Sequence, residues 1–375
     1  MKKKKVVVTG GHLTPALAVI DELLDRGGWQ IFFFGRKFAM EGDKTPSVEF
    51  QVMAEKDLPF IPIKAGRVQR RFTRYTIPAI LKIPVGFFQS FFWLLRIKPD
   101  IILSFGGYVS VPVVLAGWLL RIPVVTHEQT TVFGLATRIN AFFAKKVAVS
   151  WPQTIAKLPD NKVILTGNPI RKEIFEINEQ IWQVLNFERN LPLVFITGGN
   201  QGSHTINQTV QLVLPQLVEK VNVFHQCGHL NALGDFERLE EIRDKLPPRL
   251  KKRYHVKKYL SSVEMGTVLN KADLVVSRAG ANTITELIAL GKPVLLIPLP
   301  WLYQNEQMKN AQMVEGVGLA KILPQKELSS GSLLKVIVEM MKNLTNYQKN
   351  GAKAKKLVKL NAAQKIADLV EKTAQ

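Results

Sequence analysis

The chain has 375 residues, more than one hydrophobic core usually organises, so its length predicts two domains. Lysine and arginine number 51 against 30 acidic residues, and the net charge of +21 predicts an anionic partner: a lipid surface, a phosphorylated substrate or nucleic acid. The single cysteine, Cys227, excludes an intrachain disulfide and is consistent with a reducing compartment.

Residues 6–8 form a short apolar run between a lysine-rich start and the motif T-G-G-H at residues 9–12. Three apolar residues are too few for an export segment, so the run predicts a buried strand and no signal peptide. Thr14 as N-cap and Pro15 at the first helical position predict that a helix follows the glycine turn. His12 is then expected at the carboxyl edge of the first strand, where doubly wound sheets bind ligands. Its imidazole suits a general base, although a helix-capping or merely exposed histidine is the alternative.

Residues 58–99 contain no acidic residue, and their basic residues are Lys64, Arg67, Arg70, Arg71, Arg74, Lys82, Arg96 and Lys98. Large apolar residues alternate with these cations, a pattern typical of a segment that lies in a membrane interface. Residues 76–95 are the best candidate for a membrane span, but Lys82, Pro78, Pro84 and Gln89 predict that they do not cross. The alternative is that residues 85–95 form an ordinary buried helix.

Further apolar runs predict parallel strands buried on both faces. In the first half these strands are expected at residues 31–34, 101–104, 124–126 and 147–149. In the second half a T-G-G turn recurs after residues 194–196 and leads into a helix at residues 204–218. Strands are then expected at residues 221–224, 256–259, 274–276 and 294–297. The repeated plan predicts an α/β fold of two Rossmann-like, doubly wound domains.

Two polar turns follow strands of the first half, S-F-G-G-Y-V-S at residues 104–110 and T-H-E-Q at residues 126–129. We expect both at the same sheet edge as His12. Chance grouping of loop residues gives the same pattern, and His127 with Glu128 is equally compatible with a structural hydrogen-bonded pair.

Residues 273–297 are predicted to form a βαβ unit, with a small-residue turn at 278–282 and a helix at 283–290 that Gly291 ends. Backbone N–H groups and the helix dipole favour a phosphate at the helix start, where Thr283 adds a hydroxyl. The carboxylate of Glu286, one helical turn further on, is suited to accept hydrogen bonds from the two hydroxyls of a ribose. A nucleotide diphosphate therefore fits, although a glutamate in a first turn also serves simply to offset the dipole.

Seven motifs occur in order: T-G-G-H (9–12), S-F-G-G-Y-V-S (104–110), H-E-Q (127–129), G-N-P-I-R (167–171), G-G-N-Q-G (198–202), R-A-G-A-N-T-I-T-E (278–286) and N-E-Q-M-K-N-A (305–311). Together they resemble the MurG family, peripheral membrane N-acetylglucosaminyltransferases that convert lipid I to lipid II in peptidoglycan synthesis. The resemblance spans most of the chain and implies a GT-B fold, two Rossmann-like domains facing across a cleft. We expect an acceptor domain at residues 1–167, a linker at 168–190, a UDP-sugar domain at 191–346, and a C-terminal helix at 347–375 that packs back on the first domain.

The resemblance implies site residues position by position, with His12 as the base. Glu286 would bind the uridine ribose, Thr283 and the turn at 199–202 the diphosphate, Tyr259 and Leu260 the uracil, and Glu306, Gln307 and Asn310 the GlcNAc hydroxyls. The full implied donor set is Arg171, Gly199, Asn200, Gln201, Gly202, Tyr259, Leu260, Ala281, Asn282, Thr283, Glu286, Glu306, Gln307 and Asn310. The implied acceptor set is Thr9, Gly10, Gly11, Tyr108, His127, Glu128 and Thr130.

The chain departs from the family pattern at four places. Val7 and Val8 replace a glycine pair ahead of T-G-G-H, and Thr130 replaces an asparagine after H-E-Q. Asn200 stands where serine is common, and Glu306 where glutamine or histidine is more usual. These changes bear on details of the acceptor, phosphate and sugar contacts.

The implied reaction is an inverting transfer from UDP-GlcNAc to the MurNAc O4 hydroxyl of lipid I, at the cytoplasmic face of the cell membrane. No D-x-D triplet occurs, so no metal or cofactor is expected, and a helix dipole can hold the diphosphate. An anionic membrane surface is an expected partner, and nucleic acid is not. The alternatives are a GT-B enzyme with another lipid acceptor, a UDP-sugar epimerase, or a non-catalytic basic protein that binds nucleic acid or a membrane.

Overall fold

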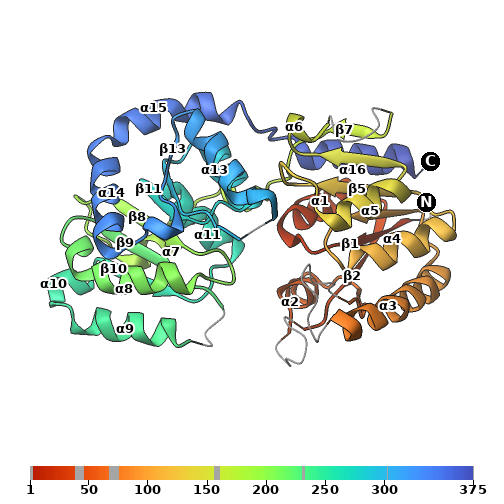
Figure 1. Cartoon of the computed structure of the whole chain (residues 1–375), viewed down its shortest axis with the longest axis horizontal. Coiled ribbons are helices and arrows are strands. Elements are labelled where there is room, and N and C mark those ends of the chain that lie inside the picture. The colour runs from red at the N-terminus through yellow and green to blue at the C-terminus, as the bar shows by residue number, and fades with distance from the viewer. Residues whose placement is uncertain are drawn as a thin grey trace. The chain divides into compact units, whose positions relative to one another are not determined.

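The strands of the chain form two separate parallel sheets, each within one of the two units of the computed structural model (Figure 1). Unit 1 comprises Met1–Arg171 and Lys359–Gln375, and unit 2 comprises Lys172–Val358. The structure describes residues 3–38, 46–66, 76–155, 161–229, 233–301 and 303–374, with backbone only for 76–81 and 303. The expected two-domain α/β architecture is confirmed.

Unit 1 contains a seven-stranded sheet in the order β3-β2-β1-β4-β5-β6-β7. Its strands are β1 (Lys4–Thr9), β2 (Trp29–Gly35), β3 (Phe60–Pro62), β4 (Ile101–Ser104), β5 (Val124–Glu128), β6 (Lys146–Val149) and β7 (Val163–Leu165). The order reverses direction between β1 and β4, which makes the carboxyl ends of these two strands the switch point where doubly wound sheets bind ligands.

Helices cover both faces of this sheet: α1 (Leu13–Arg26), α2 (Val48–Glu55), α3 (Thr76–Ile97), α4 (Ser110–Leu119), α5 (Leu135–Phe143), α6 (Pro152–Ile155) and α16 (Ala362–Thr373). Side chains alternate along β1, so Val6 and Val8 join the core with α1 and α16, whereas Val7 joins the core with α3 and α4. In Figure 1, α16 in blue lies beside α1 in red, although they are far apart in sequence.

Unit 2 repeats the plan with six strands in the order β10-β9-β8-β11-β12-β13. The strands are β8 (Leu193–Thr197), β9 (Asn222–Gln226), β10 (Tyr254–Lys257), β11 (Leu274–Ser277), β12 (Val294–Leu296) and β13 (Ala320–Ile322). The α-helices are α7 (Glu179–Leu185), α8 (His204–Val218), α9 (Asp235–Lys245), α10 (Pro248–Lys251), α11 (Ser262–Lys271), α12 (Ala281–Leu290), α13 (Glu306–Gly316), α14 (Ser330–Lys342) and α15 (Leu344–Lys355). Short 3-10 turns cover Lys172–Phe175, Tyr303–Asn305 and Gln325–Glu327. The switch point here lies between β8 and β11.

Helix starts differ from the sequence expectations at two functional turns. The helix α1 has His12 rather than Thr14 as its N-cap, and α12 begins at Ala281, two residues earlier than expected. The helix at residues 204–218 is confirmed, as is the end of α12 at Gly291, which adopts a left-handed conformation with φ of 68°.

The C-terminal tail is two helices rather than the single helix expected from residue 347. The chain leaves the helical conformation between α15 and α16. The residues that face the core therefore do not follow one helical repeat across the whole tail. Ile366, Leu369 and Val370 of α16 are buried as expected, but the expected packing of Ala352 and Leu357 is wrong, since both are exposed. In α15 the small residues Gly351 and Ala354 are buried instead, and an added Cβ at Gly351 would lie 2.8 Å from the Gly291 carbonyl oxygen.

Within the basic segment of the first half, residues 76–97 form one long helix, α3, with Pro84 inside it. No helix within the described ranges is both long and apolar enough to cross a bilayer. The helix α3 buries Gly86, Ser90, Leu94 and Ile97 and exposes Phe88, Phe92 and Leu95, so it is only partly the buried helix of the alternative, and its contact with a membrane stays a prediction. Arg67, Arg70, Arg71 and Arg74 lie outside the described residues.

Candidate active site

Two glycine turns interlock at the switch point of unit 1. The Gly11 N–H donates to the Gly106 carbonyl oxygen at 2.9 Å, and the Phe105 N–H donates to the Thr9 carbonyl oxygen at 2.7 Å. An added Cβ at Gly10 would lie 2.9 Å from the Phe105 backbone, and one at Gly107, where φ is +77°, would lie 2.8 Å from the Gly11 nitrogen. The close approach of the two turns therefore requires glycine at these positions.

His12 is held in one orientation by these turns. Its Nδ1 atom lies 2.9 Å from the Phe105 carbonyl oxygen, and because a carbonyl only accepts, Nδ1 carries the proton of the neutral ring. The Nε2 atom of the half-buried ring is then the proton acceptor. The turns therefore hold His12 in the tautomer that a general base requires.

The two other polar side chains expected beside His12 differ in their accessibility. Tyr108 is half-buried, and the Arg36 guanidinium carbon lies 5.9 Å from the centre of its ring. Arg36 also forms an ion pair of 3.3 Å with the largely buried Glu49. The Thr9 side chain is fully buried. Tyr108 is thus the more accessible of the two groups.

The H-E-Q-T segment after β5 is buried, with 0% of His127, 1% of Glu128 and 6% of Thr130 exposed. Glu128 accepts hydrogen bonds from the Thr130 N–H and hydroxyl at 3.0 and 2.8 Å. His127 Nε2 lies 3.2 Å from the Gly167 carbonyl oxygen, so the expected His127–Glu128 pair is not the one observed. Burial lowers the pKa of His127 to about 4, so the ring is neutral at physiological pH. His127, Glu128 and Thr130 therefore lie in the interior of unit 1. Their direct contact with an acceptor stays a prediction.

The T-G-G-N-Q-G turn of unit 2 follows β8 and is closed by a hydrogen bond of 2.9 Å from the Gly202 N–H to the Gly199 carbonyl oxygen. An added Cβ at Gly202, where φ is +83°, would lie 2.0 Å from the Cys227 carbonyl oxygen. Asn200 and Gln201 are exposed at the tip of the turn. On the β10 side, the half-buried Tyr259 ring stacks on His229 with 4.7 Å between ring centres, and Leu260 is buried.

The start of α12 lies beside β8, because β8 and β11 are paired neighbours. Its N-cap is Gly280, which brings no side-chain cap, and the positive end of the helix dipole lies at this start. Asn282 and Thr283 are half-buried, and Glu286 is 8% exposed one turn further on. Ala281 is buried at the first helical position. The phosphate and ribose contacts expected of these residues stay predictions.

The residues expected at the sugar lie at the start of α13. Gln304 and Asn305 precede this helix with φ of 51° and 53°, a conformation uncommon outside glycine that recurs at ligand sites. Glu306 is half-buried, and Gln307 accepts from the Leu299 N–H at 3.0 Å. Asn310 is fully buried and donates to the Ala279 carbonyl oxygen at 3.1 Å, so it supports the turn before α12 rather than facing solvent.

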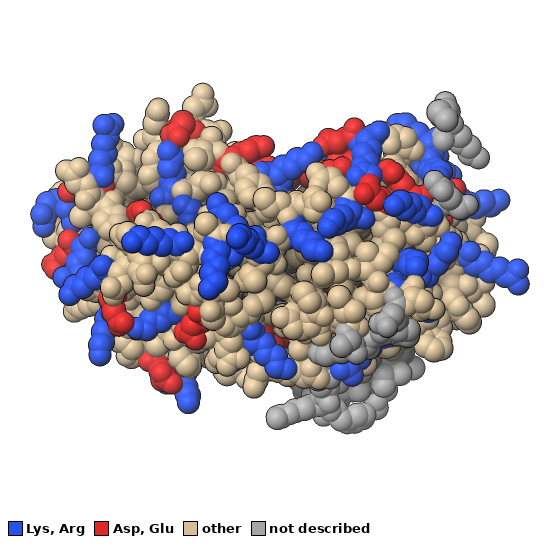
Figure 2. All heavy atoms as spheres, turned by 90° about the horizontal axis from the view of Figure 1, so that it is seen from above, with Lys and Arg blue, Asp and Glu red and all other residues tan. Residues whose placement is uncertain are grey.

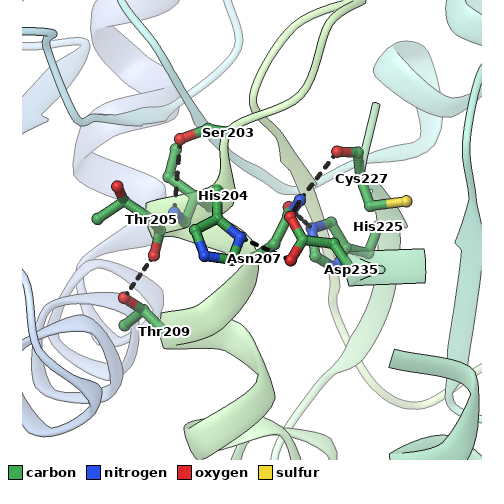
Figure 3. Close-up of polar contacts among 9 residues, drawn as sticks. Ser203, His204, Thr205, Asn207, Thr209, His225, Cys227 and Asp235 are labelled. Carbon is green, nitrogen blue, oxygen red and sulfur yellow. Dashed lines mark hydrogen bonds and ion pairs between the residues drawn. The ribbon is translucent and has the colours of Figure 1, made fainter. Parts of the chain in front are cut away.

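A buried polar chain that the sequence did not reveal anchors the start of α8 (Figure 3). His204 Nδ1 lies 2.7 Å from Asp235, the first residue of α9, and Asn207 donates to Asp235 at 2.8 Å and to the Cys227 carbonyl oxygen at 3.0 Å. The Asn207 side-chain oxygen lies 3.1 Å from His225 Nε2. Burial lowers the pKa of His225 to about 3, so this ring is neutral. These hydrogen bonds connect the start of α8, just after the turn that follows β8, to β9 and to the start of α9.

Arg171, the remaining residue of the expected donor set, ends the first segment of unit 1 and is half-buried. Its role toward the donor stays a prediction.

Comparisons with known proteins agree with this arrangement. Residues 6–149 match the glycosyltransferase family 28 N-terminal domain, and residues 193–370 match the glycosyltransferase family 28 C-terminal domain. The chain is 34% identical to the UDP-N-acetylglucosamine--N-acetylmuramyl-(pentapeptide) pyrophosphoryl-undecaprenol N-acetylglucosamine transferase 2 of Bacillus thuringiensis subsp. konkukian, covering 92% of this chain and 94% of that protein. It is also 34% identical to the transferase of the same name from Clostridium perfringens strain SM101, covering 100% of this chain and 99% of the relative.

Among solved structures, the crystal structure of Acinetobacter baumannii MurG is similar with a TM-score of 0.70 and 26% identity, covering 98% of this chain and 99% of that chain. Both halves of the sequence match domains of one family, and the fold of the whole chain is similar to a solved structure of that family. The chain belongs to glycosyltransferase family 28 and, within it, to the MurG family of GT-B enzymes.

Proposed function

We propose that this chain transfers N-acetylglucosamine from UDP-GlcNAc to the MurNAc O4 hydroxyl of lipid I, giving lipid II and UDP. The names of relatives that match nearly the full length support this reaction. The observation that carries the mechanism is the fixed His12 ring, whose Nδ1–H is committed to the Phe105 carbonyl oxygen. His12 Nε2 accepts the O4 proton while O4 bonds to the anomeric carbon and the bond from that carbon to the diphosphate oxygen breaks. UDP leaves with that electron pair, and the anomeric configuration inverts.

Unit 2 provides the features that an activated UDP sugar needs. The turn at 199–202 and the first turn of α12 offer backbone N–H groups where negative charge grows on the departing diphosphate. Glu286 accepts hydrogen bonds from the ribose hydroxyls, and the Tyr259–Leu260 segment takes the uracil. Glu306 and Gln307 face the GlcNAc hydroxyls. A crystal soaked with UDP-GlcNAc tests these roles, and a donor bound away from residues 280–286 would overturn them.

The acceptor carries a long lipid, so unit 1 must work at a membrane surface. Exposed apolar side chains occur on three successively packed helices, α3, α4 and α5. They are Ile83, Val85, Phe88, Phe92, Leu95, Trp118, Leu119, Leu135, Ile139 and Phe142, of which Phe142 is the most exposed at 76%. Large apolar groups in such number are costly in water and favourable in a bilayer interface.

Cations accompany this apolar surface. An open pocket of about 600 Å³ is lined by the aromatic residues Trp118, Phe142 and Phe143 and by the basic residues Arg121, Lys145, Lys146 and Lys162. Figure 2 shows that Lys and Arg are spread widely over the viewed face of the chain, beyond this surface. We therefore propose peripheral attachment of unit 1 to anionic lipid at the cytoplasmic face of the cell membrane.

A further inference from the structure

Arg278, the residue that follows β11, is a buried cation whose hydrogen-bond partners are all neutral. Only 7% of the residue is exposed. One terminal guanidinium nitrogen donates to the Ile297 carbonyl oxygen at 3.0 Å, and the other donates to the Ser203 hydroxyl at 2.6 Å. Its Nε is buried without a hydrogen-bond partner.

No carboxylate of unit 2 offsets this charge. Every acidic residue of the unit falls within the described ranges, and none of them forms an ion pair with Arg278. Burial alone lowers the pKa of Arg278, to about 10, which leaves the guanidinium charged at neutral pH. A buried charge normally has an opposite charge beside it, because burial without one costs several kcal/mol.

The guanidinium joins the two helix starts of the switch point. Ser203, which accepts its shorter hydrogen bond, is the N-cap of α8 and directly follows the turn at 198–202. Arg278 itself lies two residues before Gly280, the N-cap of α12. The positive ends of two helices and one unpaired guanidinium therefore gather at the same sheet edge. No group among the described residues of unit 2 offsets this charge, and an anion bound at this sheet edge would do so.

We propose that Arg278 is the fixed countercharge for the diphosphate of the nucleotide, acting from behind the turn through Ser203. This inference rests on the donor site proposed above. Arg278 is a positioning residue, since Ser203 stands between it and the ligand's expected place. Its charge favours the leaving UDP, which carries more negative charge on its terminal phosphate than the bound sugar nucleotide does.

Binding measurements with uridine, UMP and UDP separate this role from a purely structural one. We expect Arg278→Met and Arg278→Gln to weaken UDP binding about tenfold or more while uridine binding changes less than about twofold, because uridine has no phosphate. Arg278→Lys should restore most of the UDP affinity. Ser203→Ala, which keeps the charge and removes one hydrogen bond, should weaken UDP binding less than Arg278→Met does.

Two outcomes would overturn the inference: equal weakening of uridine and UDP by Arg278→Met, or unchanged UDP affinity in the methionine and glutamine variants. Thermal unfolding shows which variants fold, and Arg278→Gln keeps the test valid if Arg278→Met does not fold. Glu286→Ala distinguishes a failure of the donor site itself, because it should weaken uridine and UDP alike. If Glu286→Ala affects neither ligand, the proposed donor site is wrong. If it weakens both and Arg278→Met weakens neither, only the role of Arg278 fails.

Discussion

The Nδ1 atom of His12 lies 2.9 Å from the carbonyl oxygen of Phe105, so the turn after β4 determines which nitrogen of a residue in the turn after β1 can take a proton. Two strands distant in sequence but adjacent in the sheet thus orient the proposed base. The relationship gives His12 a chemical role that a merely exposed imidazole would lack.

His12→Ala should lower kcat for GlcNAc transfer by about a hundredfold to ten-thousandfold, the usual contribution of a general base. UDP affinity should stay the same, because the nucleotide is assigned to unit 2. His255→Gln on β10 is a matched control and should keep the wild-type rate. Wild-type turnover in His12→Ala, measured with a lipid I analogue, would refute the assignment.

Glu286→Ala should raise the KM for UDP-GlcNAc by about tenfold or more, because hydrogen bonds to a charged group contribute about 1.5–3 kcal/mol. The KM for lipid I should change little. Glu286→Gln keeps an acceptor oxygen without the charge. Its KM for UDP-GlcNAc should lie between that of the wild type and that of Glu286→Ala. Steady-state kinetics with each substrate varied in turn measure this, and equal effects on both substrates contradict the ribose contact.

Phe88→Ser and Phe142→Ser should each weaken binding to anionic liposomes by about tenfold, because each removes an apolar side chain worth about 1.5–3 kcal/mol on burial. Val184→Ser, in the 82% exposed position of α7 in unit 2, is the control and should bind normally. Flotation at low and high salt measures all three variants. Absence of wild-type flotation with anionic lipid at low salt would reject membrane attachment.

Gly107→Ala should lower the free energy of unfolding by more than about 1 kcal/mol and reduce activity, since its φ is +77° and the added Cβ would meet the Gly11 backbone. Gly331→Ala gives the contrast, because that glycine lies in the first turn of α14 with nothing within 4 Å of an added Cβ. It should leave activity unchanged and stabilise the chain by about 0.5–1 kcal/mol. Urea unfolding distinguishes the two, and equal stability would contradict the close approach of the turns.

Acid should destabilise the chain earlier than its carboxylates alone require. Burial lowers the pKa of His127 to about 4 and that of His225 to about 3, below the unfolded value of about 6.5. Between these values the unfolded chain binds more protons, so stability is full above about pH 6.5 and falls as the pH drops toward 4 and 3, by up to about 1.4 kcal/mol per histidine and pH unit. His225→Phe should reduce this slope in urea titrations of unit 2, and an unchanged slope would contradict it.

The strand pattern and the family motifs predicted the architecture, because buried parallel strands leave continuous apolar runs that need no knowledge of partners. The three strands that the pattern missed, β3, β7 and β13, lie at sheet edges and are only partly buried, whereas the equally short β12 is fully buried and was predicted.

The other features of the candidate site depend on tertiary contacts, which the sequence pattern does not show. The tautomer of His12 depends on a carbonyl 93 residues away, and the burial of His127, Glu128 and Asn310 depends on how their turns fold back on the sheet. The neutral surroundings of Arg278 could not be read from its motif, since they are set by Ser203 and Ile297, each remote in sequence.

The return of the chain to unit 1 after unit 2 has a consequence for biosynthesis. Ile366 and Val370 fill the same core as Val6 and Val8, yet the ribosome makes them only after all of unit 2. Unit 2 is contiguous and can fold as soon as it emerges, whereas unit 1 must wait with an unfilled apolar groove. The domain made first is thus the one completed last, so its turns at residues 9–12 and 104–110 reach their final support only when translation is almost over.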